Sequence, residues 1–94
     1  PPRVVNLKYE EYGVYIGRPG HGHDGYFGNP FSAIDRGLQH ALDQYRTYFE
    51  KRVVEDPEFR RRVFELWGRT LGCFCRPKPC HGDIIVEWLL RNVR

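Results

Sequence analysis

The pattern that most restricts the fold is a pair of consecutive helical segments set between short β-type segments. In the first of these, apolar residues recur at positions 34, 38, 41, 42, 45, 48 and 49. This spacing places them along one face of a helix, which we expect over residues 33–53. Ser32 and Asp35, three residues apart, resemble an N-terminal cap for that helix.

A second and a third helix are expected further along the chain. Asp56-Pro57 is typical of a helix start, because proline at the first helical position loses no hydrogen bond, and Gly68 is typical of a helix end. The last helix opens at Gly82-Asp83. The residues expected on the buried faces of these two helices are Phe59, Val63, Leu66, Trp67, Ile84, Ile85, Trp88 and Leu89.

Short β-type segments cover residues 3–7, 13–17 and 70–75. Residues 8–12 fit either a hairpin or a wider turn between the first two strands. A crossover through the two helices would bring the third strand beside an earlier one. The sequence therefore predicts an α/β or α+β fold of order β-β-α-α-β-α, with about three strands and three helices, in one compact domain over residues 1–94.

Composition limits the function only broadly. The net charge of +3 permits an anionic partner such as a nucleotide or a nucleic acid, without requiring one. No apolar run approaches about 18 residues, so we expect no membrane span. Nothing at the start of the sequence resembles a signal peptide, and we expect a cytoplasmic protein whose cysteines stay reduced.

All three cysteines lie within residues 73–80, and a histidine follows the last of them. Thiolate sulfur and imidazole nitrogen are the ligands that structural zinc prefers, four at a time in a tetrahedron. Cys73 and Cys75 would face the same side of a strand, and the prolines that follow would bend the chain back. Cys73, Cys75, Cys80 and His81 are therefore candidate ligands of a zinc ion.

The same segment permits two other interpretations. Without a metal, Cys80 would start a helix whose dipole and free amides favour the thiolate, so Cys80 would be the most acidic of the three thiols. Cys80 would then be the candidate nucleophile and His81 its acid or base. Alternatively, the cysteines are small core residues with no chemical role.

A loop over residues 18–30 is rich in glycine and proline, and loops of this length are often functional. Arg18 directly follows a strand, where a guanidinium could bind phosphate or carboxylate. Ligands of open α/β sheets commonly bind at the ends of strands. We therefore expect an anion- or nucleotide-binding crevice near the Cys80-His81 turn, built from Asn6, Arg18, Asn29 and Asp83.

Two further groups allow either a solvent-exposed or a binding role. His21 and His23 in the glycine-rich loop form a surface pair, or else contact a metal or a substrate. Residues 60–62 are three consecutive arginines, which form a solvated helix face or else bind phosphates.

The motifs together resemble a small family known only as a domain of unknown function, frequent in phage and bacterial genomes. The resemblance covers nearly the whole chain and implies that these motifs belong to one recurring design. The motifs are Val4-Val5-Asn6-Leu7, Val14-Tyr15-Ile16-Gly17-Arg18-Pro19, Gly28-Asn29-Pro30-Phe31 and the long string from Leu71 to Asp83. This sequence departs from the pattern at its longer loop before Gly28 and at Phe27, which stands where a tryptophan is expected.

Two hypotheses about function remain at this point. The first is a phage-related module with a zinc site and an adjacent nucleotide-binding crevice. The second is a small enzyme acting on a nucleotide or another phosphorylated substrate through Cys80 or His81.

Overall fold

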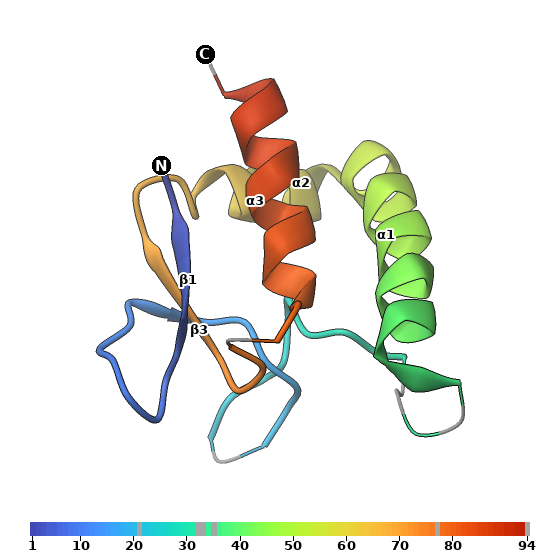
Figure 1. The fold of residues 1–94 in the computed structure, drawn as a ribbon. Helices are drawn as coiled ribbons and strands as arrows, with labels where there is room; N and C mark the ends of the chain where they lie inside the picture. The colour runs from blue at the N-terminus through green and yellow to red at the C-terminus, as the bar shows by residue number, and fades with distance from the viewer. Residues whose placement is uncertain (21, 32–33, 35, 77, 94) are drawn as a thin grey trace.

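The computed structural model describes residues 1–94 except residues 21, 32–33, 35, 77 and 94 (Figure 1). The chain forms a small sheet and three helices in the predicted order β-β-α-α-β-α, which confirms the expected α+β architecture. In chain order the elements are β1 (Arg3–Asn6), β2 (Val14–Tyr15), α1 (Gly37–Glu55), α2 (Pro57–Phe64), β3 (Thr70–Cys73) and α3 (His81–Asn92).

All three strands are parallel, and β3 lies between β1 and β2. Leu71 of β3 pairs with Val4 on one side and with Val14 on the other. The first two strands therefore do not form a hairpin, and residues 8–12 carry the chain across the sheet instead. Because the strands run in the same direction, their carboxyl ends lie at one edge, where parallel sheets usually place their binding sites.

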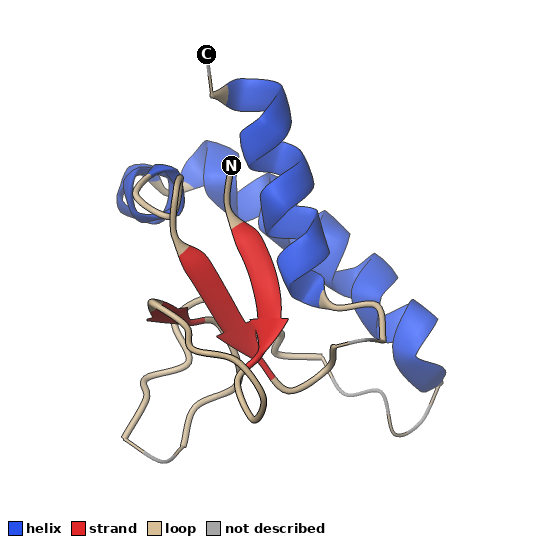
Figure 2. Cartoon of the chain, turned by 60° about the vertical axis from the view of Figure 1, so that its left-hand side comes forward, coloured by secondary structure: helices blue, strands red, loops and turns tan. Residues whose placement is uncertain are grey.

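The helices pack on one face of the sheet (Figure 2), and α3 lies between the sheet and α1 (Figure 1). Tyr45 and Phe49 of α1 are fully buried, as are Phe59 of α2 and Leu89 of α3. The rings of Phe49 and Phe59 meet edge to face at 5.6 Å between centroids, a favourable geometry for aromatic pairs. Aromatic contacts between α1 and α2 therefore form the centre of the core.

The boundaries of several elements differ from those expected: β1 and β2 are shorter than residues 3–7 and 13–17, and α1 and β3 differ as well. The helix expected from residue 33 begins at Gly37, so Ile34 precedes it and is 91% exposed; Ser32 and Asp35, its expected cap, lie outside the described residues. In the described part, Arg36 precedes the helix and makes no side-chain capping hydrogen bond. The strand expected to reach residue 75 ends at Cys73, because the chain then turns and the backbone N–H of Lys78 donates to Cys75 O at 2.8 Å.

The buried face expected of α2 is partly wrong. Phe59, Val63 and Leu66 are buried, whereas Trp67 is 38% exposed. The helix ends at Phe64, and the following turn reaches Gly68, whose φ of 81° favours glycine. The turn therefore directs Trp67 away from the helical face that it would have continued.

Gly28 allows two loop segments to approach each other closely. A Cβ atom at this position would lie 2.6 Å from Gly17 O and 3.2 Å from the Cα atom of Arg18, which are backbone atoms that cannot rotate away. The Gly17-Arg18 and Gly28-Asn29 motifs are therefore neighbours in space, held together by the absence of a side chain.

Gly28→Ala is expected to lower the free energy of unfolding by about 1–3 kcal/mol, because the added methyl group forces these backbone segments apart. Urea denaturation monitored by circular dichroism measures the change. Gly13→Ala is the matched control, since its Cβ would meet only atoms at 3.5 Å or beyond. Equal effects of the two substitutions would contradict the proposed backbone clash.

Candidate metal centre and adjoining pocket

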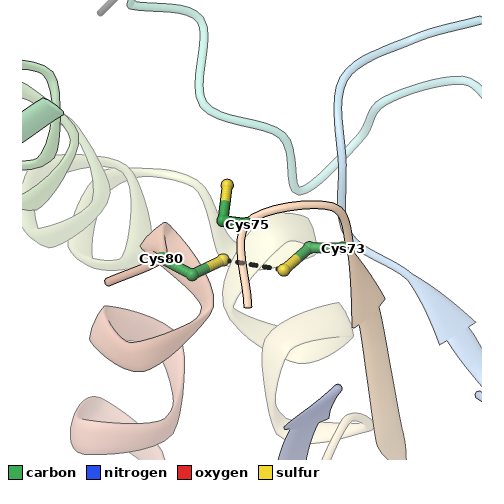
Figure 3. Close-up of side chains that lie close together, drawn as sticks. All are labelled: Cys73, Cys75 and Cys80. Atoms are coloured by element: carbon green, nitrogen blue, oxygen red, sulfur yellow. Dashed lines mark hydrogen bonds between the residues drawn. The ribbon is translucent and has the colours of Figure 1, made fainter. Parts of the chain in front are cut away.

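Three cysteine sulfurs gather where the carboxyl end of β3 meets the amino end of α3. Cys73 ends β3, Cys75 lies in the turn that follows, and Cys80 immediately precedes α3. All three are free thiols with sulfurs within 4.8 Å of one another, and the sulfurs of Cys73 and Cys80 face each other at 3.0 Å (Figure 3). Sulfurs around a tetrahedral zinc ion stand about 3.8 Å apart, so small shifts would let these three bind one ion.

Side-chain contacts with the backbone hold this turn in place. The amide of Asn6 donates to Arg76 O at 2.8 Å and to Phe74 O at 3.4 Å. The carboxylate of Asp83 accepts from Cys80 N at 3.1 Å and pairs with the guanidinium of Arg76. Both predicted ligand-binding residues thus position the backbone around the cysteines, and neither lines the pocket described below.

Cys80 and Asp83 together cap α3. The sulfur of Cys80 accepts from Gly82 N at 3.3 Å, and Asp83 bonds back to Cys80 N in a capping box. Amides at this helix terminus are therefore already bonded within the protein. That arrangement leaves few free N–H donors for the anion that was expected to bind near the Cys80-His81 turn.

His81 is 6% exposed, and a hydrogen bond fixes its ring. Its Nε2 lies 2.6 Å from Ile16 O, and because a carbonyl oxygen can only accept, Nε2 carries the proton. Nδ1 then has a free lone pair and lies 3.6 Å from Cys80 Sγ. The group of atoms within 4.8 Å of one another consists of the three sulfurs and does not include His81.

The three thiols do not titrate independently. Hydrogen bonds from Cys75 and Cys80 hold the pKa of the Cys73 thiol well below its usual range. Its bond to Cys73 raises the pKa of Cys80, as does its burial. Contrary to the expectation that Cys80 is the most acidic thiol, these contacts favour a thiolate at Cys73, which accepts hydrogen bonds from its neighbours, whereas the helix start alone would favour Cys80.

A pocket of about 350 Å³ opens beside the cysteines at the carboxyl edge of the sheet. Its apolar walls come from α1, from the loops around it and from the turn after β3. Two of the three cysteines also belong to its lining. The lining residues are Tyr15, Gly17, Arg18, Pro19, Asn29, Phe31, Leu38, Ala41, Leu42, Cys73, Phe74, Cys75 and His81. The structure thus brings Arg18, Asn29 and His81 to one pocket, whereas Cys80 does not line it.

The apolar walls are the part of the pocket that the sequence analysis missed. Leu38 and Leu42 belong to the apolar stripe of α1, which the helical spacing assigns to the core. The signal that separates them from core positions is their place in the first turns of α1, beside the glycine-rich loop. Phe31 directly follows the Gly28-Asn29-Pro30 motif, and that motif could have indicated its position.

The polar groups of the pocket already have partners in the protein. Arg18 Nη2 donates to Phe31 O at 2.6 Å. Asn29 is buried, where its amide donates to Ala41 O at 3.2 Å and its side-chain oxygen accepts from Phe31 N at 2.8 Å. Both residues therefore fix the loop as well as line the pocket.

His23 and the three consecutive arginines do not belong to the sulfur cluster. His23 stacks on Tyr15 with ring centroids 4.0 Å apart, and His21 lies outside the described residues. The three consecutive arginines are engaged locally: Arg60 donates to Val53 O and Val54 O, Arg61 pairs with Glu58 and Glu65, and Arg62 stacks over the ring of Tyr26. Arg60 thereby joins α1 to α2, whereas Arg61 is paired within its own segment and Arg62 packs on the glycine-rich loop.

Comparison with known proteins identifies the family. Residues 3–91 match a family described as a domain of unknown function, DUF4326, and the chain belongs to it. The chain is also 34% identical over 86 residues to a protein of Enterobacteria phage T4 described as an uncharacterized 12.4 kDa protein in the nrdA-td intergenic region. That match covers 90% of this chain and 74% of the phage protein. The resemblance noted in the sequence is thereby confirmed, and the domain is phage-related.

No solved structure matches the chain. Among the described residues, no helix has both the length and the apolar character needed to cross a membrane.

Asp83→Ala is expected to lower the free energy of unfolding by about 1 kcal/mol, because it removes the carboxylate that caps α3. Thermal or urea denaturation of the purified protein measures the loss. Glu50→Ala, at an exposed position of α1, is the control and should change stability by less than about 0.5 kcal/mol. An Asp83 variant as stable as the control would contradict the capping role.

Acidification should destabilise the metal-free protein through His81. Burial lowers the pKa of His81, so the unfolded state binds the proton more readily than the folded state. The contribution of His81 to the free energy of unfolding is therefore fully present above its unfolded pKa of about 6.5. It is lost as the pH decreases below that value, by at most about 1.4 kcal/mol per pH unit.

Urea titrations between pH 8 and pH 5 measure this dependence. His81→Gln should remove His81's share of it, whereas Thr47→Ala at an exposed position of α1, which removes no titratable group, should leave the dependence unchanged. A pH profile of His81→Gln that matches the unmodified protein would contradict the assignment.

Proposed function

We propose that residues 1–94 act as one zinc-binding domain in which Cys73, Cys75 and Cys80 hold the ion. The observation that carries the proposal is the convergence of three free sulfurs within 4.8 Å from a strand end, a turn and a helix start. Zinc is the favoured ion, because thiolates are soft ligands and a closely spaced set of three suits tetrahedral geometry. A reducing cytoplasm would keep these thiols available for it.

The ion would join β3 to α3. Cys73 ends the central strand and Cys80 caps the helix, so one ion bound to both fixes the contact between sheet and helix. Repulsion between adjacent thiolates would be relieved by the charge of the metal, and the low pKa of Cys73 favours ligation at neutral pH. His81 Nδ1 lies 3.6 Å from Cys80 Sγ but outside the group of three sulfurs that would hold the ion.

The proposed role of the ion is therefore to stabilise the domain and to shape the wall of the adjacent pocket. A nucleotide ligand has weaker support, since the one arginine that lines the pocket already donates to Phe31 O and the walls are mainly apolar. The enzymatic alternative, with Cys80 as nucleophile and His81 as acid or base, has a geometric obstacle. Cys80 does not line the pocket, so a substrate there would meet Cys73 or the half-buried Cys75 first.

Protein purified without chelators is expected to contain about one zinc ion per chain, and removal of the ion should lower its thermal stability. Elemental analysis measures the metal, and thermal denaturation with and without a strong chelator measures the coupling. Cys73→Ser, Cys75→Ser and Cys80→Ser should each reduce the zinc content severalfold.

His40→Ala is the control, because it removes a histidine from α1 that does not line the pocket. It should leave the zinc content at the level of the unmodified protein. Metal-free protein with three freely titrating thiols, and a denaturation temperature unaffected by added zinc, would contradict the proposal.

A further inference from the structure

We propose that the fourth coordination position of the bound ion is open to the pocket and accepts a small ring compound through one nitrogen, oxygen or sulfur atom. This inference rests on the zinc site proposed above and names the kind of molecule that the site would bind.

The positions of the three sulfurs direct the open position toward the pocket. Cys73 and Cys75 belong to the pocket wall, whereas Cys80 does not. An ion bound by all three must therefore sit in that wall. A tetrahedral ion with three protein ligands keeps one position for an exogenous ligand, and here that position lies on the side away from Cys80.

His81 is poorly placed to close the fourth position. Its ring is tethered by the 2.6 Å hydrogen bond from Nε2 to Ile16 O. Nδ1 approaches Cys80 Sγ, yet His81 does not belong to the group of donor atoms that lie within 4.8 Å of one another. Ligation by Nδ1 would require the ring to move toward Cys73 and Cys75 and to strain or break the Ile16 bond.

The pocket walls select the body of the ligand. Tyr15, Phe31 and Phe74 present aromatic rings, and Leu38 and Leu42 present aliphatic groups from α1. Such walls favour a flat apolar molecule, because rings stack on rings and lose contact with water. The volume of about 350 Å³ is at the lower end of the range for small-molecule sites, so one or two fused rings would fill it.

Cobalt-loaded protein provides the test, because Co²⁺ accepts the same tetrahedral ligands as Zn²⁺ and its visible absorption reports each change in ligation. The probe is imidazole, a single ring with a nitrogen donor. Titration of the full chain with imidazole is expected to produce a saturable change in the cobalt bands while the cobalt content stays constant.

Two variants fill the pocket without removing any cysteine. Leu42→Trp and Leu38→Trp should retain cobalt, preserve the circular dichroism spectrum and weaken the response to imidazole at least tenfold. Testing both guards against a failure of one of them to fold. Leu90→Trp, on the exposed side of α3 where Leu90 is 56% exposed, is the matched control and should respond like the unmodified protein.

Three results would overturn the inference. The first is a cobalt spectrum that imidazole leaves unchanged. The second is a response to imidazole only in His81→Ala, which would make His81 the fourth ligand. The third is a response of the pocket-filling variants as strong as that of the control. Failure of the zinc site itself is recognised earlier and separately, as the absence of thiolate-to-cobalt absorption before imidazole is added.

Discussion

The parallel pairing of β3 between β1 and β2 is the constraint on which the rest of the structure depends. It places the ends of three strands at one edge and directs the chain after Cys73 into the same region as the loop after Tyr15. The start of α3 comes to that region as well, because the turn after β3 is only a few residues long. This topology brings Arg18 close to the cysteines and His81, although it lies far from them in the sequence.

The turn after β3 combines structural and chemical roles within a few residues. Cys80 is at once a helix cap and a candidate ligand, and Asp83 caps the same helix while it pairs with Arg76. Arg76 in turn donates to Val4 O in β1, so the turn is tied to the edge strand as well. A change at any of these residues therefore alters both the stability of α3 and the position of a sulfur.

The sequence predicted the order of the elements well, because hydrophobic periodicity and proline and glycine signals act over short distances. Apolar spacing identified α1, and Pro57 identified the start of α2. The same local signals could not predict that β3 would lie between the first two strands, since strand order depends on contacts across the whole chain. They also could not show that Asn6 supports the cysteine turn, because its partners Phe74 and Arg76 lie about 70 residues away.

The cysteine cluster was predictable as a group because its members are close in sequence, but the separate environment of each thiol was not. Helix position alone suggested a low pKa at Cys80, whereas the hydrogen bonds among the sulfurs lower the pKa of Cys73 and raise that of Cys80. The pocket walls were missed for a related reason. An apolar residue at helical spacing looks the same whether it faces a packed core or an opening, and only the neighbouring loop distinguishes the two.

The start of α1 has a consequence for access to the pocket. Among the described residues, Arg36 precedes this helix and makes no side-chain capping hydrogen bond. Leu38 belongs to the first turn of the helix and forms part of the pocket wall, opposite segments that Asn6 and Gly28 hold firmly. We expect the helical side of the wall to yield more readily than the cysteine side, because terminal turns open at lower free energy than the core. Opening of the first turn of α1 would set how wide the entrance of the pocket is and how quickly a molecule can pass through it.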